Sequence, residues 1–98
     1  MRDQQILHEV KSTLALLTAK APGRAIEVRV PPYAAVQCGD GPTHTRGTPP
    51  NTIEMSADTW LALASGKLSW SDAMSSGAIA ASGVRADLTE YLPLGSEA

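Results

Sequence analysis

The sequence predicts a single α+β domain in which helices cover one face of an antiparallel-rich sheet. Three observations predict this class. Residues 4–20 carry apolar side chains at three- and four-residue steps, residues 25–30 alternate between apolar and polar, and residues 52–83 switch between these two patterns. Because the alternating strands are apolar on one side only, helices must cover that side.

The N-terminal segment is predicted to form an amphipathic helix from Gln4 to Lys20. His8 falls outside its apolar stripe, so we expect a solvated imidazole rather than a ligand. Pro22 and Gly23 then end the helix. The stripe that would face the core comprises Ile6, Leu7, Val10, Leu14, Leu17 and Ala21.

Two strands are predicted next, over residues 25–30 and 33–38. Val28 lies on the apolar face of the first strand, and Val36 and Cys38 share one face of the second. The prolines between the strands allow only a tight connection, which indicates antiparallel pairing. Residues 39–51 are the least regular segment and have room for only a very short edge strand.

Residues 52–83 are predicted to fold as strand, helix, helix and strand. The strands cover residues 52–55 and 79–82, and the helical spacing between them places Leu61 in the core. Residues 85–92 suit either a short closing helix or a turn with an extended tail, stopped by Pro93. Hydroxyl N-caps and glycine stops mark the helix ends, and they are Ser56, Gly66, Ser69 and Gly77.

Composition indicates one soluble domain over residues 1–98, with residues 95–98 frayed. The chain has 98 residues, 43% of them apolar, which is enough for one core. No apolar run approaches the roughly 20 residues that span a bilayer, so we expect no stable membrane insertion. A net charge of −2 and scattered basic residues argue against nucleic-acid binding. The lone Cys38 and the absence of a secretory pattern favour a reducing cytoplasm.

One predicted helix reads D-x-W-L-x-L-A-S-G-K-L, the short helix after it ends in S-G, and the following strand ends in glycine. This arrangement resembles the C-terminal half of the sterol carrier protein family, and we expect a bacterial member. The match is close over about a third of the chain. The matching residues are Asp58, Leu61, Gly66, Lys67, Leu68, Ala73, Gly77, Ile79 and Gly83.

This resemblance implies a five-stranded sheet with a crossover and an apolar ligand tunnel beneath the helices. The chain is shorter than that family, and its third strand is compressed into residues 39–51, so the sheet would have four strands plus a short edge strand. Two outcomes therefore stay open. The tunnel holds a small acyl chain, or the protein's own side chains fill it.

An apolar pocket between helices and sheet is the predicted ligand site. Aromatic residues at helical spacing are more often plain core, and this alternative applies to both tryptophans. Methionine suits a pocket because it adapts to irregular shapes. The residues predicted to line the pocket are Val28, Val36, Trp60, Leu63, Trp70 and Met74.

Residues 38–46 contain the groups that most resemble a reactive site. Cys38, Asp40 and His44 would form an activated thiolate if they met, but no third orienting group is evident, and Cys38 shares the face of Val36. Their spacing matches no metal site, and no cofactor is expected. The pair His44 and Arg46 suits either an anion-binding loop or a solvated hairpin.

These patterns favour non-catalytic binding of a hydrophobic small molecule, such as a lipid, a fatty acyl chain or a sterol-like compound. The alternative is an accessory or protein-interaction domain with a filled cavity, whose edge strand and tryptophans would serve a homodimer or a protein partner. A third reading is a subunit resembling the C-terminal domain of mycothiol-dependent maleylpyruvate isomerases. It ranks last because the chain contains no metal-binding helix for such an enzyme.

Overall fold

The computed structural model of the protein describes residues 3–41 and 51–94 and confirms the α+β class. Its helices and strands have the bounds α1 Gln4–Lys20, β1 Ile26–Val30, β2 Ala34–Cys38, β3 Asn51–Met55, α2 Ala57–Ser65, α3 Trp70–Ser75, β4 Ile79–Ser82 and the 3-10 helix η1 Thr89–Tyr91. In this described part, no helix is long and apolar enough to cross a membrane.

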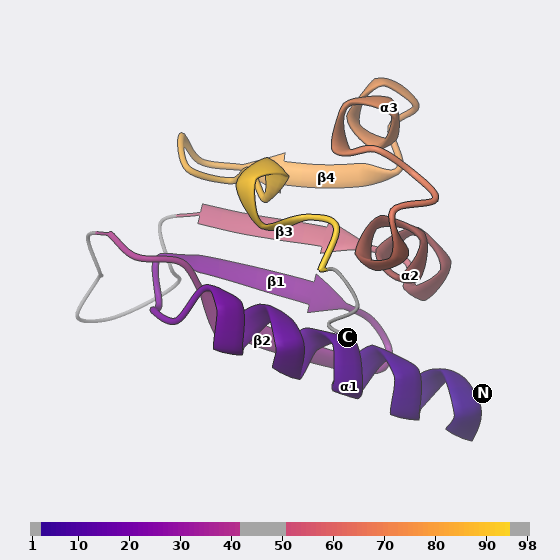
Figure 1. Cartoon of the computed structure of the whole chain (residues 1–98). Helices are drawn as coiled ribbons and strands as arrows, with labels where there is room; N and C mark the ends of the chain where they lie inside the picture. The colour runs from indigo at the N-terminus through magenta and orange to yellow at the C-terminus, as the bar shows by residue number, and fades with distance from the viewer. Residues whose placement is uncertain (1–2, 42–50, 95–98) are drawn as a thin grey trace.

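The four strands form one mixed sheet in the order β2-β1-β3-β4 (Figure 1). β1 pairs antiparallel with β2, as predicted, and β3 pairs antiparallel with β4. β3 lies parallel to β1, which requires a crossover. The five-strand prediction is not confirmed, since the described residues form four strands. Residues 42–50, where most of the compressed strand was expected, lie outside the described part.

The two faces of the sheet differ as the alternation in β1 predicts. Val28 is fully buried and lies opposite Val36 on one side and Ile53 on the other. Glu27 and Arg29 point to the other face and form an ion pair with a 3.1 Å distance between Oε2 and Nε. Figure 1 shows α1 running beside β1 and β2, whereas α2 and α3 gather near one end of the sheet.

The predicted caps form where the sequence places them. The Ser56 hydroxyl accepts a hydrogen bond from the Thr59 N–H, and the Ser69 hydroxyl accepts one from the Asp72 N–H. Gly66 ends α2 in the left-handed region with φ of 86°, a conformation that costs glycine little because it has no Cβ. Local chemistry therefore determines the start of both short helices and the end of α2.

One expected core residue of α2 lies at the surface of the core instead. Leu61 is half-buried, whereas Leu63 is only 1% exposed. We expect Leu63→Ala to lower the free energy of unfolding by about 2–5 kcal/mol and Leu61→Ala to lower it by under about 1.5 kcal/mol. Urea denaturation of both variants measures the difference, and equal losses would contradict this placement.

A short 3-10 turn and an extended tail close the chain, which decides between the two forms predicted for residues 85–92. Lys20 Nζ donates to the carbonyl oxygens of Tyr91 at 2.9 Å and Pro93 at 3.2 Å. The Leu94 N–H donates to the Ala64 carbonyl at 3.0 Å. These bonds hold the tail against the C-terminal end of α1 and against α2.

Candidate functional site

The six side chains predicted to line a pocket lie in three different environments. Val28 and Trp60 are 0% exposed and Leu63 is 1% exposed, so these three belong to the packed core. Val36 and Trp70 are half-buried, and Met74 is 42% exposed. The structure therefore does not bring the six together around one space beneath the helices, and their contacts with a ligand stay a prediction.

Trp60 fills the space between α2 and α1 and is anchored at its polar end. The indole Nε1 donates to the Thr13 hydroxyl at 2.7 Å. The same hydroxyl lies 2.7 Å from the carbonyl oxygen of Glu9, to which it donates. Both polar groups are thereby satisfied, so the indole is fixed as a core side chain rather than a pocket wall.

The first apolar depression is a groove between α1 and α2, here called the α1–α2 groove. It has a volume of about 520 Å³. Leu16 on α1 is 51% exposed and faces this space, with Leu61 and Ala64 from α2 and Leu94 from the tail. The polar residues around it are His8, Glu9, Ser12, Thr13, Ser65 and Lys67. His8 is exposed, as predicted.

A second apolar depression of about 350 Å³ lies on the other side of the tail. Leu63 and Trp70, two of the predicted six, both line it together with Leu92 and Pro93. Leu94 lines the α1–α2 groove, so the tail contributes side chains to both depressions. Two of the predicted six therefore line the second depression, and none of the six lines the α1–α2 groove.

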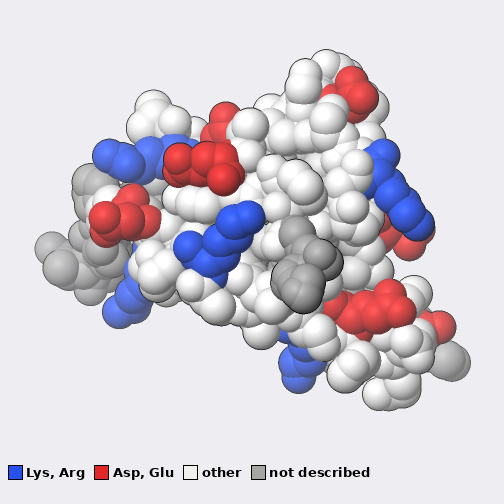
Figure 2. All heavy atoms as spheres, in the orientation of Figure 1, with Lys and Arg blue, Asp and Glu red and all other residues white. Residues whose placement is uncertain are grey.

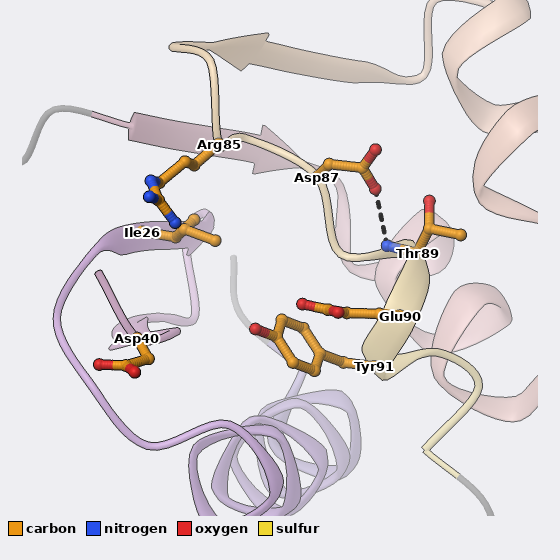
Figure 3. A pocket seen from close by; sticks show the side chains of 7 residues that line it. All are labelled: Ile26, Asp40, Arg85, Asp87, Thr89, Glu90 and Tyr91. Carbon is orange, nitrogen blue, oxygen red and sulfur yellow. Dashed lines mark hydrogen bonds between the residues drawn. The ribbon is translucent and has the colours of Figure 1, made fainter. Parts of the chain in front are cut away.

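A third depression is polar and was not predicted from the sequence. We call it the charged cleft. It has a volume of about 400 Å³ and is lined by Ile26, Asp40, Arg85, Asp87, Thr89, Glu90 and Tyr91 (Figure 3). Its residues come from β1, from just after β2 and from the segment after β4, so no local sequence motif predicts the cleft. Asp40 was singled out in the sequence only as a neighbour of Cys38.

Asn51 connects the elements that form the charged cleft. It is 3% exposed, its Nδ2 donates to the Ala25 carbonyl at 2.9 Å, and its Oδ1 accepts from the Arg85 N–H at 2.9 Å. At the other wall, burial raises the pKa of the Tyr91 hydroxyl, and the adjacent Glu90 carboxylate raises it further. The cleft is therefore built on a hydrogen-bonded frame.

The remaining surface in view shows no dominant charge. In Figure 2, lysine and arginine side chains alternate with aspartate and glutamate side chains, and neither sign forms a broad patch. This distribution agrees with the net charge of −2. Within residues 3–41 and 51–94, no three histidine, cysteine or acidic side chains are grouped so that they could hold a metal ion.

Cys38 is a buried free thiol, and of its two predicted partners only Asp40, which is exposed, lies among the described residues. His44 and Arg46 both lie outside the described residues. Cys38 is 0% exposed, and burial raises the pKa of its thiol to about 11. A thiol with this pKa is protonated at neutral pH, and the protonated form is a poor nucleophile.

The raised pKa predicts a pH dependence of stability. The unfolded thiol releases its proton near pH 9.0 and the folded thiol near about pH 11. The contribution of Cys38 to stability is therefore complete below pH 9 and is lost as the pH rises toward about 11. Urea denaturation across this range should show wild type losing stability relative to Cys38→Ala. Parallel curves for the two proteins would contradict the prediction.

Comparisons with known proteins identify the family. A comparison with curated proteins returned no match. A family model described as bacterial SCP ortholog matches residues 2–94. The match includes all the described helices and strands, and it agrees with the resemblance carried by residues 52–83. The chain therefore belongs to the bacterial sterol-carrier-protein-like family.

Proposed function

We propose that the protein binds and carries a hydrophobic small molecule, such as a lipid, a fatty acyl chain or a sterol-like compound, in the α1–α2 groove. The observation that carries this proposal is the groove itself, with Leu16 half-exposed above an apolar wall from α2. Membership of the sterol-carrier-like family supports a carrier role.

The packed interior supports this groove, rather than a tunnel, as the site of the proposed ligand. Val28 and Trp60 occupy the space where a tunnel beneath the helices was expected. The α1–α2 groove, at about 520 Å³, lies within the size range of small-molecule sites. A bound acyl chain would remove Leu16 and Leu61 from water, and apolar burial contributes roughly 25 cal/mol per Å².

The binding that we propose involves no covalent step. Transfer of apolar surface from water into the groove supplies the driving force. The protonated Cys38 thiol has no role in it, so Cys38→Ala should bind the same ligand with unchanged affinity. A folded Cys38→Ala variant that fails to bind would contradict this part of the proposal.

A charge placed in the groove tests the site. Leu16→Asp should weaken binding of dansylated undecanoic acid by at least about tenfold, because a buried leucine contributes roughly 1.5–3 kcal/mol. Leu16 is already half-exposed, so the variant should fold normally. Fluorescence titration measures the dissociation constant, which for wild type should be micromolar, on the order of −8 kcal/mol.

Val84→Asp is the matched control. Val84 is 100% exposed and does not line the groove, so the same substitution there should leave the dissociation constant unchanged. Equal affinities for Leu16→Asp and wild type would remove the groove as the site. Native mass spectrometry of protein purified from cells tests the carrier function itself, since a bound lipid would appear as added mass. No added lipid mass together with no probe uptake would overturn the proposal.

The filled interior also supports a second candidate function, an accessory or protein-interaction domain of the same fold. The full burial of Val28 and Trp60 is the observation that favours it. In this case the protein would act through a homodimer or a protein partner rather than a ligand. Sedimentation velocity over a range of concentrations measures the dimer, and a monomer at all concentrations together with saturable lipid binding would reject this alternative.

A further inference from the structure

The charged cleft shares no lining residue with the α1–α2 groove, and its chemistry differs from that of the groove. We propose that it binds a small zwitterionic molecule, one that presents a carboxylate to Arg85 and ammonium groups to Asp40 and Glu90. An amino acid with a cationic side chain has this arrangement of charges. The volume of about 400 Å³ is within the range of small-molecule sites.

The cleft has two walls that face each other. Figure 3 shows the Glu90 and Tyr91 side chains reaching from η1 toward the side that carries Arg85 and Asp40. Figure 3 also shows Asp87 on the segment that leads from Arg85 into η1, where the Thr89 N–H donates to Asp87 Oδ1 at 2.7 Å. The cleft is therefore bordered by one guanidinium, three carboxylates and one phenol, and one of the carboxylates, Asp87, already accepts a hydrogen bond within the chain.

These opposite charges do not neutralise one another. Among the described residues, the ion pair between Glu27 and Arg29 is the only one, so Arg85 pairs with no carboxylate of the cleft. A molecule with a single sign of charge would satisfy one set of groups and face repulsion from the other. A zwitterion satisfies both sets, which is the reason for choosing this class of ligand.

The backbone of the wall that carries Arg85 is held in place before any ligand binds. Asn51 fixes the backbone of Arg85 through the hydrogen bond to its N–H. Arg85 also packs against the chain at Gly41, where an added Cβ would lie 3.1 Å from its Nη1. A segment whose backbone is already ordered loses less entropy on binding than a mobile one. The ordered backbone at Arg85 therefore favours binding even though the charged side chains are exposed.

Apolar surface at the base of the cleft complements the charges. Ile26 is 4% exposed, and both Ile26 and the Tyr91 ring line the cleft. A methylene chain between the charged ends of a ligand could contact both. An ammonium group near the face of a tyrosine ring gains a further attraction of about 0.5–1 kcal/mol at exposed sites. The cleft thus suits a ligand with charged ends and a short aliphatic linker.

The test is an amide-resolved NMR titration of the full chain with L-lysine at low ionic strength, where screening of exposed charges is weakest. Saturable shifts are expected at the amides of Asp40, Arg85, Glu90 and Tyr91. Cadaverine lacks only the carboxylate, and hexanoate lacks both ammonium groups. Each should bind at least about fivefold more weakly than L-lysine, because each leaves one set of charges unsatisfied.

Variants assign the shifts to the cleft. Arg85→Met should weaken L-lysine binding by about tenfold, the loss expected for one charge-assisted contact. The same substitution should strengthen cadaverine binding, because it removes the repulsion between the guanidinium and the diamine. Asp40→Asn combined with Glu90→Gln should weaken both. Lys67→Met, a charge removed at the α1–α2 groove, should change neither. Binding of dansylated undecanoic acid should be unaffected by Arg85→Met, so this proposal and the carrier function can fail separately.

Three results would overturn the proposal. No saturable shift at about 10 mM L-lysine would mean that the charges of the cleft are simply solvated. Cadaverine binding as tightly as L-lysine would make the cleft an amine site without a carboxylate contact. Unchanged L-lysine affinity in Arg85→Met would place the binding elsewhere on the molecule.

Discussion

Trp60→Ala should lower the free energy of unfolding by about 3–5 kcal/mol, the largest effect of any single substitution in the core. Trp60 is the largest of the fully buried side chains, and its indole reaches from α2 to Thr13 on α1. Its removal leaves a cavity and also takes the indole donor away from Thr13. Urea denaturation followed by circular dichroism measures the loss.

Thr13→Val separates the hydrogen bond of Trp60 from its packing. This variant keeps the volume of the side chain at residue 13 but leaves the buried indole N–H without its acceptor, at a cost of about 1–3 kcal/mol. A Trp60→Ala variant that loses less than about 1 kcal/mol would contradict a filled interior. It would also restore the tunnel beneath the helices as the site of a hydrophobic ligand.

Asn51→Ala should lower the free energy of unfolding by about 2–4 kcal/mol, although Asn51 is a polar residue at the start of a strand. Its amide group satisfies two backbone groups from distant segments, the Ala25 carbonyl and the Arg85 N–H. Alanine would leave both backbone groups without this partner. Asn51 is only 3% exposed, so the two groups would lack a partner in a buried position. Each unsatisfied buried group costs roughly 1–3 kcal/mol.

Arg85→Met is the control for Asn51→Ala. It keeps the backbone N–H that Asn51 accepts from and removes only the guanidinium, so the free energy of unfolding should stay within about 0.5 kcal/mol of wild type. Asn51→Ala should also weaken L-lysine binding in the charged cleft, because Arg85 loses its anchor. An Asn51→Ala variant as stable as wild type would show that water replaces the amide.

Local patterns in the sequence were sufficient for most elements of the fold. The helical spacing of Val10, Leu14 and Leu17 predicts α1, and all three are buried. Ser56 and Ser69 predict the starts of α2 and α3 because their hydroxyls bond to amides only three residues away. Such short-range chemistry acts within one turn of the chain, so one sequence is enough to predict it.

The same patterns do not predict which side of a helix packs against its neighbours. Leu61 and Leu63 both fit the apolar spacing of α2, yet only Leu63 is fully buried. Helical spacing gives a face of the helix but not the rotation at which that face meets α1 and the sheet. The six residues predicted to line one pocket lie apart for the same reason. Val28, Trp60 and Leu63 face the packed core instead.

The sequence by itself determined the α+β class, the antiparallel pairing of β1 with β2, the helix caps and the family. These rest on periodicity, turn chemistry and motif spacing, which act over a few residues. Only the tertiary structure decided that the interior is filled, that β3 lies parallel to β1, and that Asp40, Arg85 and Glu90 border one cleft. Those features join segments that are distant in the sequence, such as β1 with β3 and Asp40 with Arg85, and their proximity arises only when the core packs.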